Sequence, residues 1–121
     1  MALTSAMEDY LEAVFMLQKQ NGHVRCVDVA KQLRVKKPSV SRAVKELSRS
    51  DHLVKNADGT LSLTETGLQL AEQIYEKHRF FTERLIAAGV DPKTAEQDAC
   101  GIEHVISSES FQKLKKVFDD G

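Results

Sequence analysis

Apolar residues recur at helical spacing over most of the chain, and only a short middle segment alternates as strands do. The helical spacing predicts helices at residues 5–20, 27–33, 37–48, 65–88, 92–106 and 108–117. The alternating segment predicts strands at 53–55 and 60–63, separated by a turn that contains Asp58-Gly59, a strong hairpin signal. The pattern therefore indicates a mainly α protein with one small hairpin.

Residue types at the predicted helix ends support these boundaries. Ser5 with Glu8 three residues later is a capping-box pattern, so we expect the first helix to begin at Ser5. Pro38 lies in the first turn of its helix, where its missing N–H costs nothing. Gly89 ends the long helix, since glycine is common just past a helix C-terminus.

The helices at 27–33 and 37–48 are joined by a three-residue turn, which is typical of a helix-turn-helix. The hairpin that follows predicts a winged helix. We expect a winged helix-turn-helix DNA-binding domain at 1–64 and a small all-α dimerisation domain at 65–121, linked by the long helix that starts near 65. So small a helical domain buries too little surface to be stable alone, which favours dimerisation.

The inward-facing apolar positions predict two cores. The predicted core of the winged helix contains Leu11, Val14, Phe15, Val29, Leu33, Val40, Val44, Leu47 and Leu63. The second core and the dimer interface are predicted to share Ile74, Phe81, Leu85, Ile86, Val90, Ile102, Val105, Ile106, Phe111, Leu114 and Phe118.

Composition restricts the class of protein. The chain has 121 residues, of which 41% are hydrophobic and 29% charged, as expected for a packed, helix-rich domain pair. No apolar run approaches the roughly 18 residues of a membrane span. The N-terminus lacks the pattern of a secretory signal, and two cysteines, Cys26 and Cys100, are too few for a disulfide framework. We therefore expect a cytoplasmic protein without a membrane partner; the sequence assigns no role to Cys26.

The net charge of -1 conceals a basic segment. Residues 31–55 contain eight Lys and Arg against two acidic residues, a local excess of six positive charges. Such an excess indicates contact with an anionic polymer, here double-stranded DNA read by the helix at 37–48. The alternatives are a solvated helix face and a winged helix that contacts protein.

Arg42 is the predicted guanine-reading residue of that helix, because its guanidinium can form two hydrogen bonds to one base. Ser39 and Ser41 suit phosphate or base contacts, and Pro38 suits a thymine methyl group. Backbone phosphates are the predicted partners of the lysines. The predicted DNA-binding residues are Lys36, Lys37, Pro38, Ser39, Ser41, Arg42, Lys45 and Lys55.

Cys100, Glu103 and His104 are the candidate metal ligands of the helix at 92–106. Their i, i+3, i+4 spacing puts a thiol, a carboxylate and an imidazole on one helix face, and all three can bind a first-row transition metal. Asp9 and Glu12 are spaced i, i+3 on the first helix. Helical spacing leaves open whether the separate helices bring these residues together.

Other roles remain open for these residues. Cys100 could be a thiol that senses oxidants, although acidic neighbours disfavour a low thiol pKa. Cys100 and His104 could act as nucleophile and base, but no oxyanion hole or glycine-rich loop accompanies them, so we expect no enzyme. A structural zinc without a regulatory role is a third alternative.

Five segments, in order along the chain, resemble the diphtheria toxin repressor family of metal-dependent repressors. They are Met7–Glu12, Lys37–Ser41, Leu61–Gly67, Lys77–Arg79 and Ala99–Ser107. The length of the chain and the absence of a C-terminal SH3-like domain are similar to the short manganese-regulator branch. The resemblance implies a homodimer that binds palindromic operator DNA when loaded with Mn(II) or Fe(II), commonly to repress metal-uptake genes, and that takes no organic substrate.

The resemblance also implies a ligand set, which includes His78, an isolated candidate on the long helix. The implied metal ligands are Asp9, Glu12, His78, Cys100, Glu103 and His104. Glu12 matches the manganese branch, since the iron branch has methionine there, whereas Cys100 matches the iron branch. The oxygen-rich set favours Mn(II), and the thiolate shifts preference toward Fe(II), Co(II) or Zn(II), the last two being candidates in vitro. One or two ions per subunit are both compatible with this set.

Overall fold

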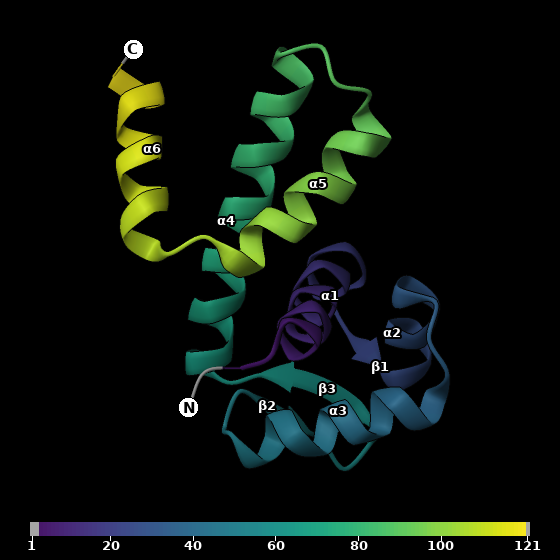
Figure 1. The fold of residues 1–121 in the computed structure, drawn as a ribbon. Coiled ribbons are helices and arrows are strands. Elements are labelled where there is room, and N and C mark those ends of the chain that lie inside the picture. The colour runs from purple at the N-terminus through teal and green to yellow at the C-terminus, as the bar shows by residue number, and fades with distance from the viewer. Residues whose placement is uncertain (1–2, 121) are drawn as a thin grey trace. The chain divides into compact units, whose positions relative to one another are not determined.

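The computed structural model describes residues 3–120, which divide into two compact units between Glu72 and Gln73 (Figure 1). We call them the N-terminal unit and the C-terminal unit. The long helix α4, Glu65–Ala87, begins in the first unit and continues into the second. The division into domains at 1–64 and 65–121, which falls at the start of α4, stays a prediction.

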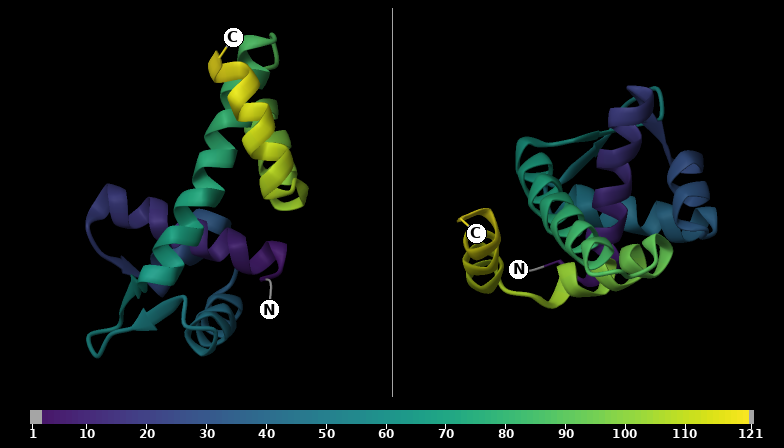
Figure 2. Two further views of the ribbon diagram at one scale, coloured as in Figure 1. Left: turned by 90° about the vertical axis from the view of Figure 1, so that its left-hand side faces the viewer. Right: turned by 90° about the horizontal axis from the view of Figure 1, so that it is seen from above.

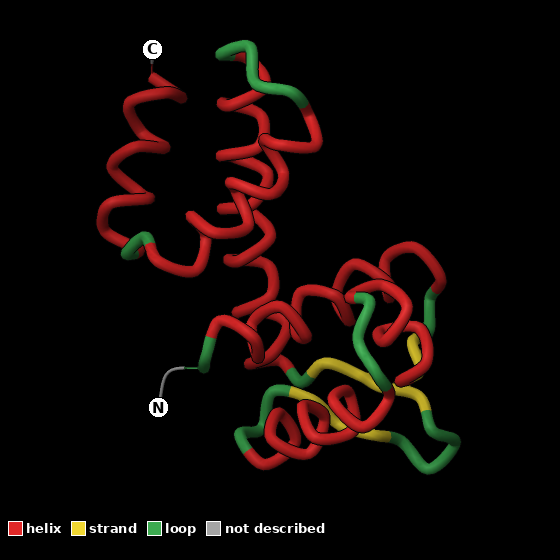
Figure 3. Tube along the Cα trace, turned by 45° about the vertical axis from the view of Figure 1, so that its right-hand side comes forward, coloured by secondary structure: helices red, strands yellow, loops and turns green. Residues whose placement is uncertain are grey.

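The N-terminal unit is a winged helix-turn-helix, which confirms the predicted fold. Its elements are α1 (Ser5–Asn21), β1 (Val24–Arg25), α2 (Cys26–Leu33), α3 (Lys37–Arg49), β2 (Leu53–Lys55), β3 (Thr60–Leu63) and the start of α4. The strands, yellow in Figure 3, form an antiparallel sheet in the order β1-β3-β2. The β2–β3 hairpin is the wing.

Two details of this unit differ from the sequence predictions. The pattern did not predict β1, which has only two residues and pairs Val24 with Leu61. The predicted cap at Ser5 is wrong by one residue, because Thr4 is the N-cap of α1 and its side chain accepts a hydrogen bond from the Met7 amide. Either hydroxyl could cap the helix, so the residue types alone do not separate them.

The core of the N-terminal unit is closed around α1. Leu11 and Val40 are completely buried, and the neighbouring strands contribute Val24, Leu53 and Leu61. Most of the predicted core is confirmed, whereas Leu33 and Leu63 are only half-buried. The buried apolar residues of this unit are Leu11, Ala13, Val14, Phe15, Leu17, Val24, Val29, Ala30, Val40, Ala43, Val44, Leu47, Leu53, Leu61 and Ala71.

Gly67 allows the first turn of α4 to pack tightly against the turn before β2. A Cβ atom at this position would lie 1.9 Å from the backbone oxygen of His52, so no larger residue fits without movement. The Thr64 hydroxyl, which accepts from the Gly67 amide, donates to the backbone oxygen of Asp51 at 2.7 Å. These contacts make the start of α4 part of the winged helix.

The C-terminal unit consists of the rest of α4, α5 (Pro92–Val105) and α6 (Ser108–Asp120). Gly89, with a φ of +101°, lies in the turn that follows α4. The Asp91 side chain caps α5 by accepting hydrogen bonds from the Lys93 and Thr94 amides. The Lys77 ammonium donates to the Ile106 carbonyl at the end of α5, at 3.5 Å. All three predicted helices are present.

Aromatic side chains join α6 to α4. The Phe80 ring packs edge-on against Phe81, Phe111 and Phe118 at centroid distances of 5.1 to 5.6 Å. An ion pair between Lys115 and Glu76 ties the same two helices. Views along two further directions are given in Figure 2. Within residues 3–120, no helix has both the length and the apolar character needed to cross a membrane.

Candidate metal centre and DNA-binding surface

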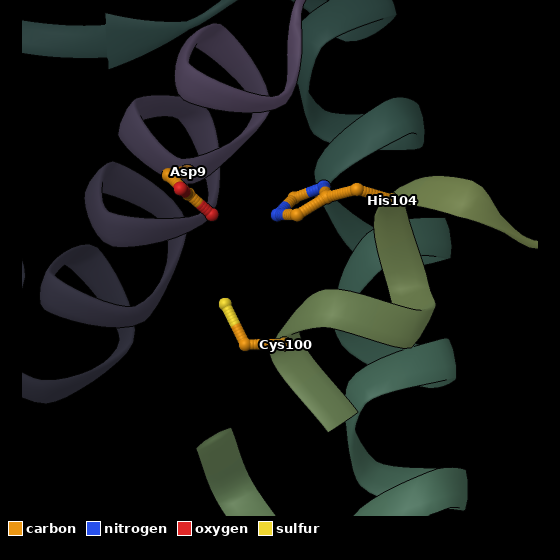
Figure 4. A group of neighbouring side chains, drawn as sticks. All are labelled: Asp9, Cys100 and His104. Atoms are coloured by element: carbon orange, nitrogen blue, oxygen red, sulfur yellow. The ribbon is translucent and has the colours of Figure 1, made fainter. Parts of the chain in front are cut away.

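The three candidate ligands of α5 lie on one face of the helix, as their spacing predicts. Figure 4 shows the Cys100 sulfur and the His104 ring on the same side of α5, one turn apart. Both residues are half-buried, and Glu103 between them is buried, with its side chain 0% exposed. A carboxylate on this face is thus removed from water, which is costly unless a cation or hydrogen-bond donors compensate it.

His78 on α4 meets Glu103 from within the same unit. Its Nδ1 atom lies 3.2 Å from Oε1 of Glu103. The second carboxylate oxygen of Glu103, Oε2, is buried and has no hydrogen-bond partner among the described residues. A buried carboxylate with only one oxygen satisfied is destabilising, and a bound cation would relieve that cost.

In the N-terminal unit, Asp9 and Glu12 lie on one face of α1, which Figure 4 shows with Asp9 drawn as sticks. Glu12 is 8% exposed, which is unusual for a carboxylate, and Asp9 is half-buried. The sequence pattern also allowed these acids to be solvated residues of the first turns. Their burial argues for a role in the interior.

The donor types fit a divalent first-row metal ion. Within the C-terminal unit, α4 and α5 supply two imidazoles, one carboxylate and one thiol, and α1 offers two further carboxylates. Imidazole and carboxylate suit Mn(II) and Fe(II), and a thiolate extends the range to Co(II) and Zn(II). The unsatisfied oxygen of Glu103 is the structural feature that a cation would complete.

Helix α3 presents its polar residues to solvent while its apolar residues hold it in the core. Val40, Ala43, Val44 and Leu47 are buried on one side. Lys36 is its N-cap residue and Pro38 occupies its first turn. Every predicted DNA-binding residue is exposed: Lys36, Lys37, Pro38, Ser39, Ser41, Arg42, Lys45 and Lys55. The predicted recognition surface is therefore accessible.

The wing contains a contact that the sequence analysis missed. The Arg25 guanidinium donates to the backbone oxygen of Asp58 in the wing turn, at 2.7 Å. The two residues are 33 positions apart, and Arg25 belongs to the strand that the pattern did not predict. No spacing signal could have found this pair.

Comparison with known proteins identifies matches over both halves of the chain. Residues 2–60 match the iron-dependent repressor N-terminal DNA-binding domain, and residues 64–120 match the iron-dependent repressor metal-binding and dimerisation domain. The transcriptional regulator MntR of Shouchella clausii is 34% identical over 111 residues, covering 92% of this chain and 78% of that protein.

Two further relatives extend the comparison. An uncharacterized HTH-type transcriptional regulator of Methanocaldococcus jannaschii is 32% identical over 115 residues, covering 93% of this chain and 92% of that protein. The solved structure of the manganese regulator SloR superposes with a TM-score of 0.83 at 27% identity. The superposition covers 98% of this chain but only 55% of the SloR chain, so this chain spans about half the length of that solved relative.

Proposed function

The chain belongs to the iron-dependent repressor family of metal-dependent transcriptional regulators, and we propose that it is a homodimeric repressor whose operator binding requires Mn(II) or Fe(II). The family consists of DNA-binding regulators and not of enzymes. A regulator of this kind acts in the cytoplasm, where the DNA is. The regulated genes would be those for metal uptake.

The observation that carries the proposal is the buried Glu103 carboxylate. It faces His78 at 3.2 Å and leaves its second oxygen unsatisfied, between a half-buried thiol and a half-buried imidazole on the same helix. An arrangement of this kind is costly for an apoprotein and favourable for one that binds a divalent cation. A solvated helix face would place these groups in water instead.

The proposed metal ligands are contributed by both units. The α5 and α4 residues are Cys100, Glu103, His104 and His78, and the α1 residues are Asp9 and Glu12. A bound ion supplies positive charge that offsets the carboxylates. Without it, the negative charges of Asp9, Glu12 and Glu103 lack this compensation. Metal therefore favours the DNA-binding conformation through its tighter binding to that conformation.

Cys100 bears on which metal is used. Carboxylates and imidazoles of the proposed set suit Mn(II), which agrees with the manganese regulators among the relatives. The Cys100 thiolate strengthens binding of Fe(II), and of Co(II) and Zn(II) in vitro. The thiol-redox alternative has no comparable support, because Cys100 shares its helix face with a buried carboxylate, which disfavours the thiolate that oxidation requires.

Helix α3 would enter the major groove of the operator. Arg42 reads guanine, and Pro38, Ser39 and Ser41 contact bases or phosphates near the helix start. Lys36, Lys37, Lys45 and Lys55 bind phosphates and position the protein. Two copies related by twofold symmetry would read a palindromic operator with half-sites about 34–36 Å apart.

Fluorescence anisotropy tests the proposal with the full-length dimer. A palindromic duplex is first selected by the Mn(II)-loaded protein from a randomised pool, and Mn(II), Fe(II), Co(II) and Zn(II) are then titrated into chelated protein at fixed salt. We expect metal-dependent binding that Glu103→Ala abolishes. Equal affinity with and without metal, together with identical small-angle scattering of both forms, would contradict the proposal.

A further inference from the structure

The wing turn is held by a continuous set of hydrogen bonds. The Asp58 carboxylate accepts from the Thr60 amide at 2.9 Å and from the Thr60 hydroxyl at 2.6 Å. The Asn56 amide group donates to the Thr60 and Ser62 hydroxyls at 3.0 and 2.9 Å. The Gly59 amide donates to the Asn56 carbonyl at 2.9 Å. These bonds fix the turn before any DNA is bound.

Arg25 connects this turn to the helix-turn-helix. It stands directly before α2, and its backbone amide donates to the Asp28 carboxylate at 2.9 Å, which closes the first turn of that helix. Its guanidinium reaches the Asp58 carbonyl at 2.7 Å. In the sheet, Arg25 is paired with Thr60 of β3. One residue therefore bonds both to the first turn of α2 and to the wing turn.

Gly59 leaves the space that this contact needs. A Cβ atom at residue 59 would lie 2.9 Å from the Arg25 guanidinium, and the residue has a φ of +89°, a conformation that glycine adopts without strain. The charge of Arg25 also helps to hold the pKa of the Asp58 carboxyl below its ordinary value, after the two hydrogen bonds from Thr60. The turn is thus shaped around the guanidinium.

We propose that Arg25 is a positioning residue that holds the wing, and with it Lys55, in the orientation in which wing and α3 contact DNA together. The inference rests on the proposed DNA-binding function and goes beyond it. Lys55 ends β2, directly before the turn that Arg25 contacts. One Nη1–H of the exposed guanidinium donates to the Asp58 carbonyl, and through this bond Arg25 contributes to affinity by orienting Lys55.

A double-mutant cycle on the full-length, Mn(II)-loaded dimer tests this inference. Arg25→Ala, Lys55→Ala and the double variant are compared for binding to the selected duplex at one salt concentration. Loss of one hydrogen bond or one phosphate contact should reduce affinity about fivefold per variant. Because both changes remove the same Lys55 contact, we expect the double variant to match the single ones. Lys93→Ala, which removes one exposed charge in the C-terminal unit, is the control.

Hydrogen exchange of the wing amides provides a readout that does not involve DNA. In Arg25→Ala, the Gly59 and Asn56 amides, which donate to Asn56 and Thr60 carbonyls, should exchange faster than in wild-type protein, while the thermal midpoint stays near that of Lys93→Ala. Unchanged exchange at these amides would overturn the inference.

The outcomes of the binding cycle separate three cases. Multiplicative losses, about 25-fold in the double variant, would mean that Arg25 contacts DNA independently and would overturn the positioning role. Unchanged affinity of Arg25→Ala would overturn it as well. Failure of wild-type protein to select any duplex would contradict the proposed function itself, which the wild-type measurement reveals before any variant is made.

Discussion

The two units differ in how completely they bury their apolar side chains. In the N-terminal unit the large apolar residues of α1, α3 and all three strands meet in one closed core. The described residues of the C-terminal unit bury mainly Ile74 and Phe111, while Ile86, Val105, Leu114, Val117 and Phe118 are exposed. Exposed large apolar side chains in such number are typical of a unit that another protein covers. The difference teaches that the N-terminal unit completes a core of its own, whereas we expect the second unit to depend on dimerisation.

The proposed DNA-binding residues and the candidate metal ligands differ in their exposure to solvent. The side chains of α3 proposed to contact DNA, including Arg42 and Lys45, are exposed. The candidate metal ligands include Glu103 and Glu12, which are buried. The proposed DNA-binding residues are therefore exposed, whereas the candidate metal ligands include buried carboxylates from each unit. Four changes test or sharpen this contrast.

The largest effect on stability is expected from Leu11→Ala. Leu11 is 0% exposed, so its truncation leaves a cavity in the closed core and should reduce the free energy of unfolding by about 3–5 kcal/mol. Urea unfolding followed by circular dichroism measures this loss. The matched change Leu114→Ala removes a side chain that is 39% exposed and should instead weaken the dimer in sedimentation experiments. Equal effects of both changes on unfolding would contradict the contrast between the units.

Glu103→Gln should lower metal affinity by at least about tenfold, since even residues that only support a ligand contribute 10–100-fold. The substitution keeps the shape of the side chain, but it removes the charge and replaces one acceptor oxygen by an NH2 donor. Titration calorimetry with Mn(II) and Co(II) measures the change. Glu96→Gln alters an exposed carboxylate on the same helix and should bind both metals as wild-type protein does. A wild-type affinity in Glu103→Gln would remove this residue from the ligand set.

Lys45→Ala should weaken DNA binding to a similar degree on all sequences. A phosphate contact contributes about one unit per subunit to the dependence of log K on log salt concentration, so the slope should become shallower by that amount. Anisotropy titrations at several salt concentrations give the slope. An unchanged slope would mean that Lys45, although exposed on α3, does not contact phosphate.

The smallest effect is expected from Thr60→Val in the wing. The Thr60 hydroxyl and amide hold the pKa of Asp58 below its ordinary value of 3.8, so the variant, which lacks the hydroxyl, should titrate closer to 3.8. Because the pKa is lowered in the folded state, these bonds stabilise the wing above pH 3.8, and the stabilisation is lost as pH falls through the lowered pKa. Carboxyl chemical shifts followed by NMR between pH 2 and about 6 check this; an equal pKa in both proteins would contradict it.

Local periodicity predicted most of the fold. The ends of α1, α3, α4 and α5 were predicted to within one residue, because apolar spacing and residues such as Pro38 and Gly89 act within a single turn. Helix α6 extends to Asp120, past the predicted end at Val117. Strand β1 was missed because two residues cannot show alternation, and its existence depends on pairing with β3, far away in the sequence.

For the candidate site too, features within one helix were predicted, and features that depend on packing between elements were not. The shared face of Cys100, Glu103 and His104 follows from spacing on one helix. The contact between His78 and Glu103 joins residues 25 positions apart. Helical spacing left open whether their helices meet, and resemblance to a known family favoured it. The burial of Glu103 was not predicted either, since exposure is decided by what packs on a helix and not by the helix itself. Arg25 in the wing was missed for the same reason.

The tight packing at Gly67 affects where recombination can separate the winged helix from the rest of the chain. The first two turns of α4 belong to the N-terminal unit, where the His52 carbonyl fills the place of a side chain at residue 67. A gene fragment that ended at the wing would lack the first turns of α4. It would therefore expose this carbonyl and the part of the core that Ala71 fills. Recombination that transfers this winged helix to another protein should therefore carry the sequence to about residue 72, so that the recipient inherits part of a helix and not a free loop.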